Sequence, residues 1–176
     1  ELSLGNSYAE IAARYKDLNN YDEAIKYLNR AIRTFKTENK SFKLAMALVI
    51  QSDIYNELEK FDDSIHALDE AVILAKDFQD ELMDGRIKAS YGFIYMAQKE
   101  YRKSEKSLLN AIEHFQNMNR TNLVLDSMMQ LIQIYIEVSD LESAKSIYDK
   151  CKKISKRVNN KIMLSTLENF SQLNSN

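Results

Sequence analysis

The sequence of 176 residues contains no proline, no tryptophan, only three glycines and a single cysteine. Because proline and glycine interrupt helices and form turns, their scarcity predicts long helices joined by short polar corners. One cysteine cannot form an internal disulfide, which indicates a reducing compartment. The sequence also lacks a run of about 18 apolar residues, so we expect no membrane-spanning segment and a cytoplasmic protein.

The sequence also has no excess of basic residues. The net charge is −2, and 24 Lys and Arg residues stand against 26 Asp and Glu residues. Proteins that bind nucleic acids concentrate positive charge to neutralise phosphates, so we expect no nucleic-acid binding by this domain and no membrane binding. The contents of 45% hydrophobic and 28% charged residues are typical of a globular domain. The chain starts at Glu1 without a signal-like segment, and we interpret it as part of a longer protein.

One stretch of the sequence occurs four times, at intervals of 40 residues. Residues 55–71 read YNELEKFDDSIHALDEA. The equivalent segments 15–31, 95–111 and 135–151 read YKDLNNYDEAIKYLNRA, YMAQKEYRKSEKSLLNA and YIEVSDLESAKSIYDKC. All four begin with Tyr and place small and large apolar residues at the same positions. Four copies in register, without an insertion, predict equal units that stack on one another.

Each 40-residue unit is predicted to form two amphipathic helices. Apolar residues recur at spacings of three and four, which places them in one stripe on a helix with 3.6 residues per turn. The corners contain only a few polar residues, so the two helices of a unit must be antiparallel. The units are expected at about 1–40, 41–80, 81–120 and 121–160, with helices at 2–18 and 22–36, 42–58 and 62–77, 82–98 and 102–117, and 122–138 and 141–155.

The last segment departs from the repeat. Residues 161–173 are predicted to form one more helix, with these apolar residues on one face: Met163, Leu164, Leu167, Phe170 and Leu173. Polar residues stand where the earlier units place packing residues: Glu168, Ser171, Gln172 and Ser175. We interpret the segment as a capping helix that exposes polar groups at the end of the stack. The alternative is the first half of a further repeat.

The repeated pattern resembles the tetratricopeptide repeat (TPR) family. In the first unit it is carried by Tyr8, Ile11, Ala12, Tyr15, Tyr21, Ala24, Leu28 and Ala31. In the third unit it is carried by Tyr91, Gly92, Tyr95, Tyr101, Leu108 and Ala111. The family's closing proline is absent, and the period is 40 residues instead of about 34. This longer period resembles sensory and regulatory bacterial TPR domains, including those of peptide-responsive transcription factors and phosphatases.

The resemblance implies an all-α fold, a right-handed superhelical solenoid of four TPR-like helix pairs plus a C-terminal capping helix. It also implies that residues 1–176 form a single TPR domain. The concave side of such a solenoid is lined by the first helix of each pair, on the stripe that faces away from the second helix.

Residues for catalysis or metal binding are not arranged in a pattern that predicts a site. His66 and His114 lie at different positions of the repeat and without metal-ligand spacing, so we interpret them as surface residues. Cys151 stands where the first unit has Ala31, which predicts a buried small residue and not a nucleophile. The glycines are too scattered for a phosphate loop. We therefore expect a protein without enzyme activity, metal or cofactor.

The stripe that is expected to line the concave side is unusually apolar in its middle. Flexible Met side chains beside a few polar groups suit a bound peptide, extended or helical. Acidic residues around Arg86 favour a ligand with some positive charge: Glu10, Asp53, Glu57 and Glu137. We predict a protein- or peptide-binding groove formed by Met46, Val49, Ile50, Asp53, Arg86, Ser90, Phe93, Met96, Met129, Gln130 and Gln133.

Two alternatives stay open at this point. The inner stripe can be packed core, or the contact surface for a neighbouring domain. The chain can also be a scaffold that forms homo-oligomers or holds an effector domain through its apolar ends: Leu2, Leu4, Ile162, Met163 and Phe170. A clamp for a C-terminal carboxylate, which some TPR domains form with Lys, Asn and Arg, is not expected. Only Arg86 of such a set is present, and Ala9, Ala13, Ile50 and Ser90 stand at the other positions.

Overall fold

The computed structural model describes the backbone of residues 3–173 and the side chains of residues 3–170. Within this range the chain is entirely helical and forms four consecutive helix pairs followed by a ninth helix. The pairs are α1 (Leu4–Asp17) with α2 (Tyr21–Thr37), α3 (Ser41–Glu57) with α4 (Phe61–Ala75), α5 (Glu81–Ala97) with α6 (Tyr101–Asn117), and α7 (Thr121–Glu137) with α8 (Leu141–Arg157); α9 (Lys161–Leu173) follows. The expected all-α solenoid is confirmed. Leu2, the predicted start of the first helix, lies outside the described residues.

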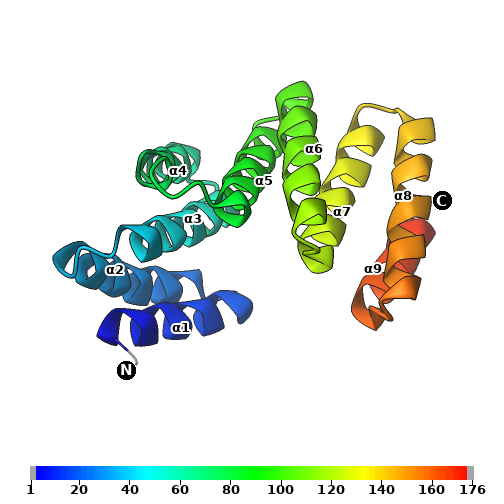
Figure 1. Cartoon of the computed structure of the whole chain (residues 1–176). Helices are drawn as coiled ribbons and strands as arrows, with labels where there is room; N and C mark the ends of the chain where they lie inside the picture. Colours follow the sequence, from blue (N-terminus) through cyan, green and yellow to red (C-terminus); the bar gives the residue numbers. More distant parts are fainter. Residues whose placement is uncertain (1–2, 174–176) are drawn as a thin grey trace.

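The helix pairs follow one another along an arc (Figure 1). The first helices of the pairs, α1, α3, α5 and α7, lie on its inner side, and their partners lie on the outer side. The terminal helix α9 continues the inner series after α8. The inner helices are therefore placed side by side along one concave face.

Each corner between the described helices contains one residue with left-handed backbone geometry. These residues recur every 20 positions with φ between 47° and 61°: Asn19, Asn39, Glu59, Gln79, Lys99, Asn119, Ser139 and Asn159. After α1, the N–H of Asn20 donates to the C=O of Tyr15 and the N–H of Asn19 donates to the C=O of Lys16, both at 2.9 Å. The same two hydrogen bonds are present at the ends of α2, α3, α5, α6, α7 and α8, but not at the end of α4. They satisfy the carbonyls at the helix ends, so the helices end without glycine.

The corner residue Lys99 has a φ of 61°. A Cβ makes this region costly for Lys, whereas glycine adopts it freely and Asn tolerates it. Lys99→Gly is therefore expected to raise the free energy of unfolding by about 0.5–1 kcal/mol. Asn119→Gly is the matched control and should change it less. Urea unfolding followed by circular dichroism measures both, and an equal effect of the two substitutions would contradict this interpretation.

Packing within the helix pairs depends on one complementary pair of positions. A Cβ added to Gly5 would lie 2.5 Å from the ring of Phe35, and one added to Gly85 would lie 2.8 Å from the ring of Phe115. All residues at these two positions are buried, and in unit order they are Gly5 with Phe35, Ala45 with Ala75, Gly85 with Phe115, and Leu125 with Ser155. In three of the four units a large residue on one helix is thus matched by a small one on the other, and the second unit has two alanines; the match explains two of the three glycines.

In two of the helix pairs, a buried serine of the second helix forms a hydrogen bond to the backbone of the first helix. The hydroxyl of Ser64 donates to the C=O of Ser52 at 2.7 Å, and the hydroxyl of Ser104 donates to the C=O of Gly92 at 2.6 Å. A Cβ on Gly92 would lie 2.7 Å from the side chain of Leu108. The backbones of α5 and α6 therefore approach closely at this point, which explains the third glycine.

The terminal helix α9 packs against the end of the stack. Met163 and Leu167 are 9% and 0% exposed, and the hydroxyl of Tyr148 donates to the C=O of Leu167 at 3.2 Å. Glu168 is exposed. The side chains of Ser171, Gln172, Leu173 and Ser175 lie outside the described residues. The helix is thus anchored by one apolar face, as both the cap and the further-repeat interpretations require.

Candidate functional site

A cavity of about 190 Å³ lies on the inner face, among α3, α5 and α7. Four of the predicted groove residues line it: Asp53, Arg86, Ser90 and Phe93. Lys16 from α1 and Asp126 from α7 line it as well. The cavity is therefore built mainly from the first helices of all four pairs, the surface on which the groove was expected, with Phe115 contributed by α6.

A carboxylate and a hydroxyl are paired in this cavity. The hydroxyl of Ser90 on α5 donates to Oδ1 of Asp53 on α3 at 2.6 Å. Burial raises the pKa of Asp53, while the Ser90 hydrogen bond and the charges of Lys16 and Arg86 act in the opposite direction. No ion pair with Asp53 is formed within residues 3–170. The half-buried carboxylate thus lies in the cavity without an ion-pair partner, an arrangement that a positively charged ligand group would relieve.

The raised pKa of Asp53 predicts a pH-dependent stability. The folded protein holds this proton more tightly than the unfolded chain, so Asp53 destabilises the fold once the pH exceeds the raised pKa. Asp53→Asn is therefore expected to be more stable than the natural protein at neutral pH, and the difference should vanish as the pH falls below the ordinary value of 3.8. The substituted amide oxygen can still accept the Ser90 hydrogen bond. Urea unfolding at a series of pH values measures the difference, and a constant difference would contradict the account.

The other predicted groove residues lie along the same face but are not all equally accessible. Five apolar residues are half-buried and pack against the buried hydrophobic core of the helix pairs: Met46, Ile50, Phe93, Met96 and Met129. Gln130 and Gln133 are half-buried, and Nε2 of Gln133 donates to Oε1 of Glu137 at 3.1 Å. Val49 is only 1% exposed and belongs to the core. The stripe therefore combines core edge and open surface, and we leave Val49 out of the proposed site.

The structure brings into the site further residues of the concave stripe, which the predicted set of groove residues did not include. Lys16 and Asp126 line the cavity, although neither was in the predicted set. Asp126 occupies the position of Arg86 one unit later, so the 40-residue period placed it on the correct face. Asn56, also on α3, has a buried Oδ1 without a hydrogen-bond partner among the described residues. Such an acceptor is costly when it is unpaired.

The candidate reactive residues are not gathered into a site. His66 is exposed and His114 is half-buried, both on outer helices. Cys151 is 0% exposed, and burial raises the pKa of its thiol to about 11, so the thiol stays protonated at neutral pH. Within the described part of the chain, no three His, Cys, Asp or Glu residues are grouped so as to hold a metal ion. None of the described helices is both long enough and apolar enough to cross a bilayer.

Comparison with known proteins agrees with this architecture. Residues 5–36 match the sequence model of the tetratricopeptide repeat family. The described units repeat the same two-helix structure up to residue 157. The chain therefore contains a tetratricopeptide repeat, and its other units share the two-helix structure of that repeat. Its TPR units extend the motif beyond the segment that the family model matches.

The relatives of this TPR protein include bacterial regulators. It is 25% identical over 154 residues to the regulatory protein RapG of Bacillus subtilis (strain 168), a match that covers 86% of the TPR chain and 40% of RapG. In fold it is similar to aspartyl phosphate phosphatase F from Bacillus subtilis, with a TM-score of 0.81 and 18% identity over 93% of this chain and 43% of that one. A Rap protein complexed with competence and sporulation factor gives a TM-score of 0.83 and 15% identity over 91% and 45% of the two chains. The TPR chain thus spans less than half the length of these proteins, and the structural matches show a shared fold.

Proposed function

We propose that this TPR protein is a non-catalytic module that binds a peptide or protein segment along its concave face. It would serve as the sensory or interaction part of a cytoplasmic bacterial regulator. The observation that carries the proposal is the inner cavity, in which the Asp53–Ser90 pair lies among apolar side chains and a few further polar ones: Lys16, Arg86, Asp126 and Ser127. Apolar pockets with a few placed polar groups are typical of ligand sites. The regulatory relative RapG and the Rap protein complexed with competence and sporulation factor support the same function.

The cavity favours a ligand that carries a positive charge between apolar side chains. A Lys or Arg side chain, or an N-terminal amine, would pair with Asp53 and with Asp126 on the other side of the cavity. Phe93 and the half-buried Met96 offer apolar contact beside them. The unpaired Oδ1 of Asn56, one helical turn from Asp53, would accept a ligand N–H group.

A catalytic role has less support in the cavity. Activation of a serine normally needs a histidine or another base that can take its proton. Ser90 instead donates to Asp53, and both histidines lie on the outer helices α4 and α6. One relative in fold is named a phosphatase, but that likeness is at 18% identity and concerns the fold.

The scaffold alternative needs exposed apolar residues at the two ends of the solenoid, and the structure exposes fewer of them than the sequence suggested. Of the five apolar end residues, Leu4 and Ile162 are 58% and 83% exposed. Met163 is 9% exposed, and Phe170 packs against the buried core formed by the last two helix pairs and α9. Leu2 lies outside the described residues. Of the four that the structure describes, Leu4 and Ile162 are therefore the two that expose a large apolar surface for pairing.

Affinity selection with a defined peptide library tests the proposal. The library consists of pentapeptides whose central residue is Lys or Glu and whose other positions are Ala, Leu, Met or Phe. Immobilised protein is expected to enrich Lys peptides over their Glu counterparts by about tenfold or more, as mass spectrometry measures. Asp53→Asn should abolish this preference. Equal recovery of Lys and Glu peptides, or no recovery of either, would overturn the proposed function.

A further inference from the structure

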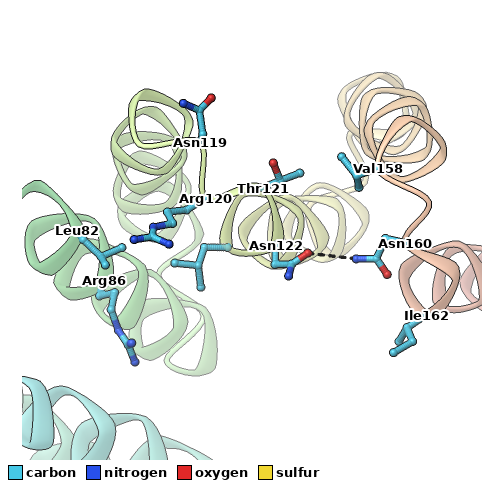
Figure 2. A pocket seen from close by; sticks show the side chains of 10 residues that line it. Leu82, Arg86, Asn119, Arg120, Thr121, Asn122, Val158, Asn160 and Ile162 are labelled. Carbon is cyan, nitrogen blue, oxygen red and sulfur yellow. Dashed lines mark hydrogen bonds between the residues drawn. The ribbon is translucent and has the colours of Figure 1, made fainter.

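A second, larger cavity lies at one rim of the solenoid. Its volume is about 870 Å³, and it is lined from the first turns of α5, α7 and α9 and from the corners that precede α7 and α9 (Figure 2). It shares only Arg86 and Leu123 with the inner cavity. The rim cavity therefore adjoins the candidate groove, and eight of its ten lining residues are absent from the inner cavity.

The charged side chains of the rim cavity are all positive. Arg86 and Arg120 line it, and no Asp or Glu does. Neither guanidinium forms an ion pair within residues 3–170. Figure 2 shows Arg120 extending from the start of α7 toward α5, on which Leu82 and Arg86 lie. In a chain with a net charge of −2, this concentration of positive charge is a local feature that would attract an anionic group.

The polar and apolar residues around the two arginines suit a peptide segment better than a small ion. Asn119, Asn122 and Asn160 line the cavity, and Nδ2 of Asn160 donates to Oδ1 of Asn122 at 3.4 Å (Figure 2). Apolar surface is supplied by Val158 and Ile162, which are 42% and 83% exposed. A single anion would leave most of the volume and this apolar surface empty, whereas pockets of about 300–1,000 Å³ hold larger ligands.

The start of α7 adds to the positive character. Its N-cap residue is Arg120, and no side chain caps the helix by a hydrogen bond. The first N–H groups of α7 are therefore left without a side-chain acceptor, and they carry the positive end of the helix dipole. This end of the helix forms part of the cavity wall through Thr121 and Asn122.

We propose that the rim cavity is a second docking site, which takes an acidic segment of a partner protein. A carboxylate of the segment binds the guanidinium of Arg120 with paired hydrogen bonds, and Arg86 on the neighbouring helix α5 adds positive charge to the cavity wall. The Asn side chains bind the segment's backbone, and its apolar residues cover Val158 and Ile162. The site does not depend on a ligand in the concave groove, so it extends the proposed function without resting on it.

Fluorescence anisotropy of a labelled hexapeptide of alternating Glu and Leu tests the proposal, with a Lys–Leu peptide as the reference probe. The Glu–Leu probe is expected to bind with an affinity that falls as salt rises, and Arg120→Glu should weaken it by about tenfold or more. Arg102→Glu is the matched control, because Arg102 is exposed at the start of α6, outside the cavity, and carries the same charge. It should leave the affinity nearly unchanged.

The outcomes separate this site from the groove. Arg120→Glu should retain the selection of Lys pentapeptides, and Asp53→Asn should retain binding of the Glu–Leu probe. The proposal is overturned if the Lys–Leu probe binds as well as the Glu–Leu probe, or if Arg102→Glu weakens binding as much as Arg120→Glu. Complete displacement of the probe by millimolar inorganic phosphate would also overturn it, because that result describes a simple anion site.

Discussion

Gly85→Leu is expected to lower the free energy of unfolding by about 3 kcal/mol. Even a Cβ at this position would lie 2.8 Å from the ring of Phe115 and 3.1 Å from Cβ of His114. A leucine therefore fits only if Phe115 leaves its place between the helices, where it is 1% exposed. Urea unfolding followed by circular dichroism measures the loss.

The fourth unit indicates which second substitution compensates. Phe115→Ser alone is expected to cost about 4 kcal/mol, because it leaves a cavity where the ring was. Gly85→Leu with Phe115→Ser reproduces the Leu125 and Ser155 of the fourth unit. The double variant should therefore lose about 2 kcal/mol less than the sum of the single variants. Additive losses would show that the two positions do not exchange volume.

Phe93→Asp is expected to weaken binding of the selected Lys pentapeptides about 30-fold. A loss of this size is typical when a central anchor residue of an interface is removed. The Phe93 ring lines the inner cavity and is half-buried, so its outer surface is available to a ligand. The substitution removes this apolar contact and adds charge at the edge of the core. Isothermal titration calorimetry with one selected peptide measures the change.

A matched substitution on the outer side separates binding from general effects. Ile73 lies on α4 and is 65% exposed, so Ile73→Asp makes a similar chemical change away from the cavity. It should leave the peptide affinity unchanged. A circular dichroism spectrum confirms that both variants stay folded. Equal losses of affinity for Phe93→Asp and Ile73→Asp would place the peptide outside the concave groove.

The architecture was largely predictable because the 40-residue period carries it. Small residues such as Ala24 and Ala31, and large ones such as Leu28, recur at fixed positions, and all three are 0% exposed. The break at Asn19 and Asn20 was visible too, since Asn adopts left-handed geometry. The equivalent geometry at Lys99 could not be read from its own residue type, because the corner hydrogen bonds and the period impose it there.

The candidate site was predictable in its location but not in its detail. The repeat placed Asp53, Ser90 and Phe93 on the inner face, yet their convergence depends on how α3, α5 and α7 stack. Val49 has the pattern of a groove residue and is buried, because helices this close use one side of the stripe for packing. The rim cavity had no sequence signal, since its residues come from corners in different units, which only the superhelix brings together.

Backbone amide chemical shifts measured by NMR during a titration with a selected Lys pentapeptide test the central claim most directly. The account predicts that the shifts concentrate on the inner helices, at Asp53, Ser90, Phe93 and Asp126, and that the outer helices α2, α4 and α8 stay unchanged. Shifts confined to the outer helices or to the end of α9 would contradict a concave binding groove.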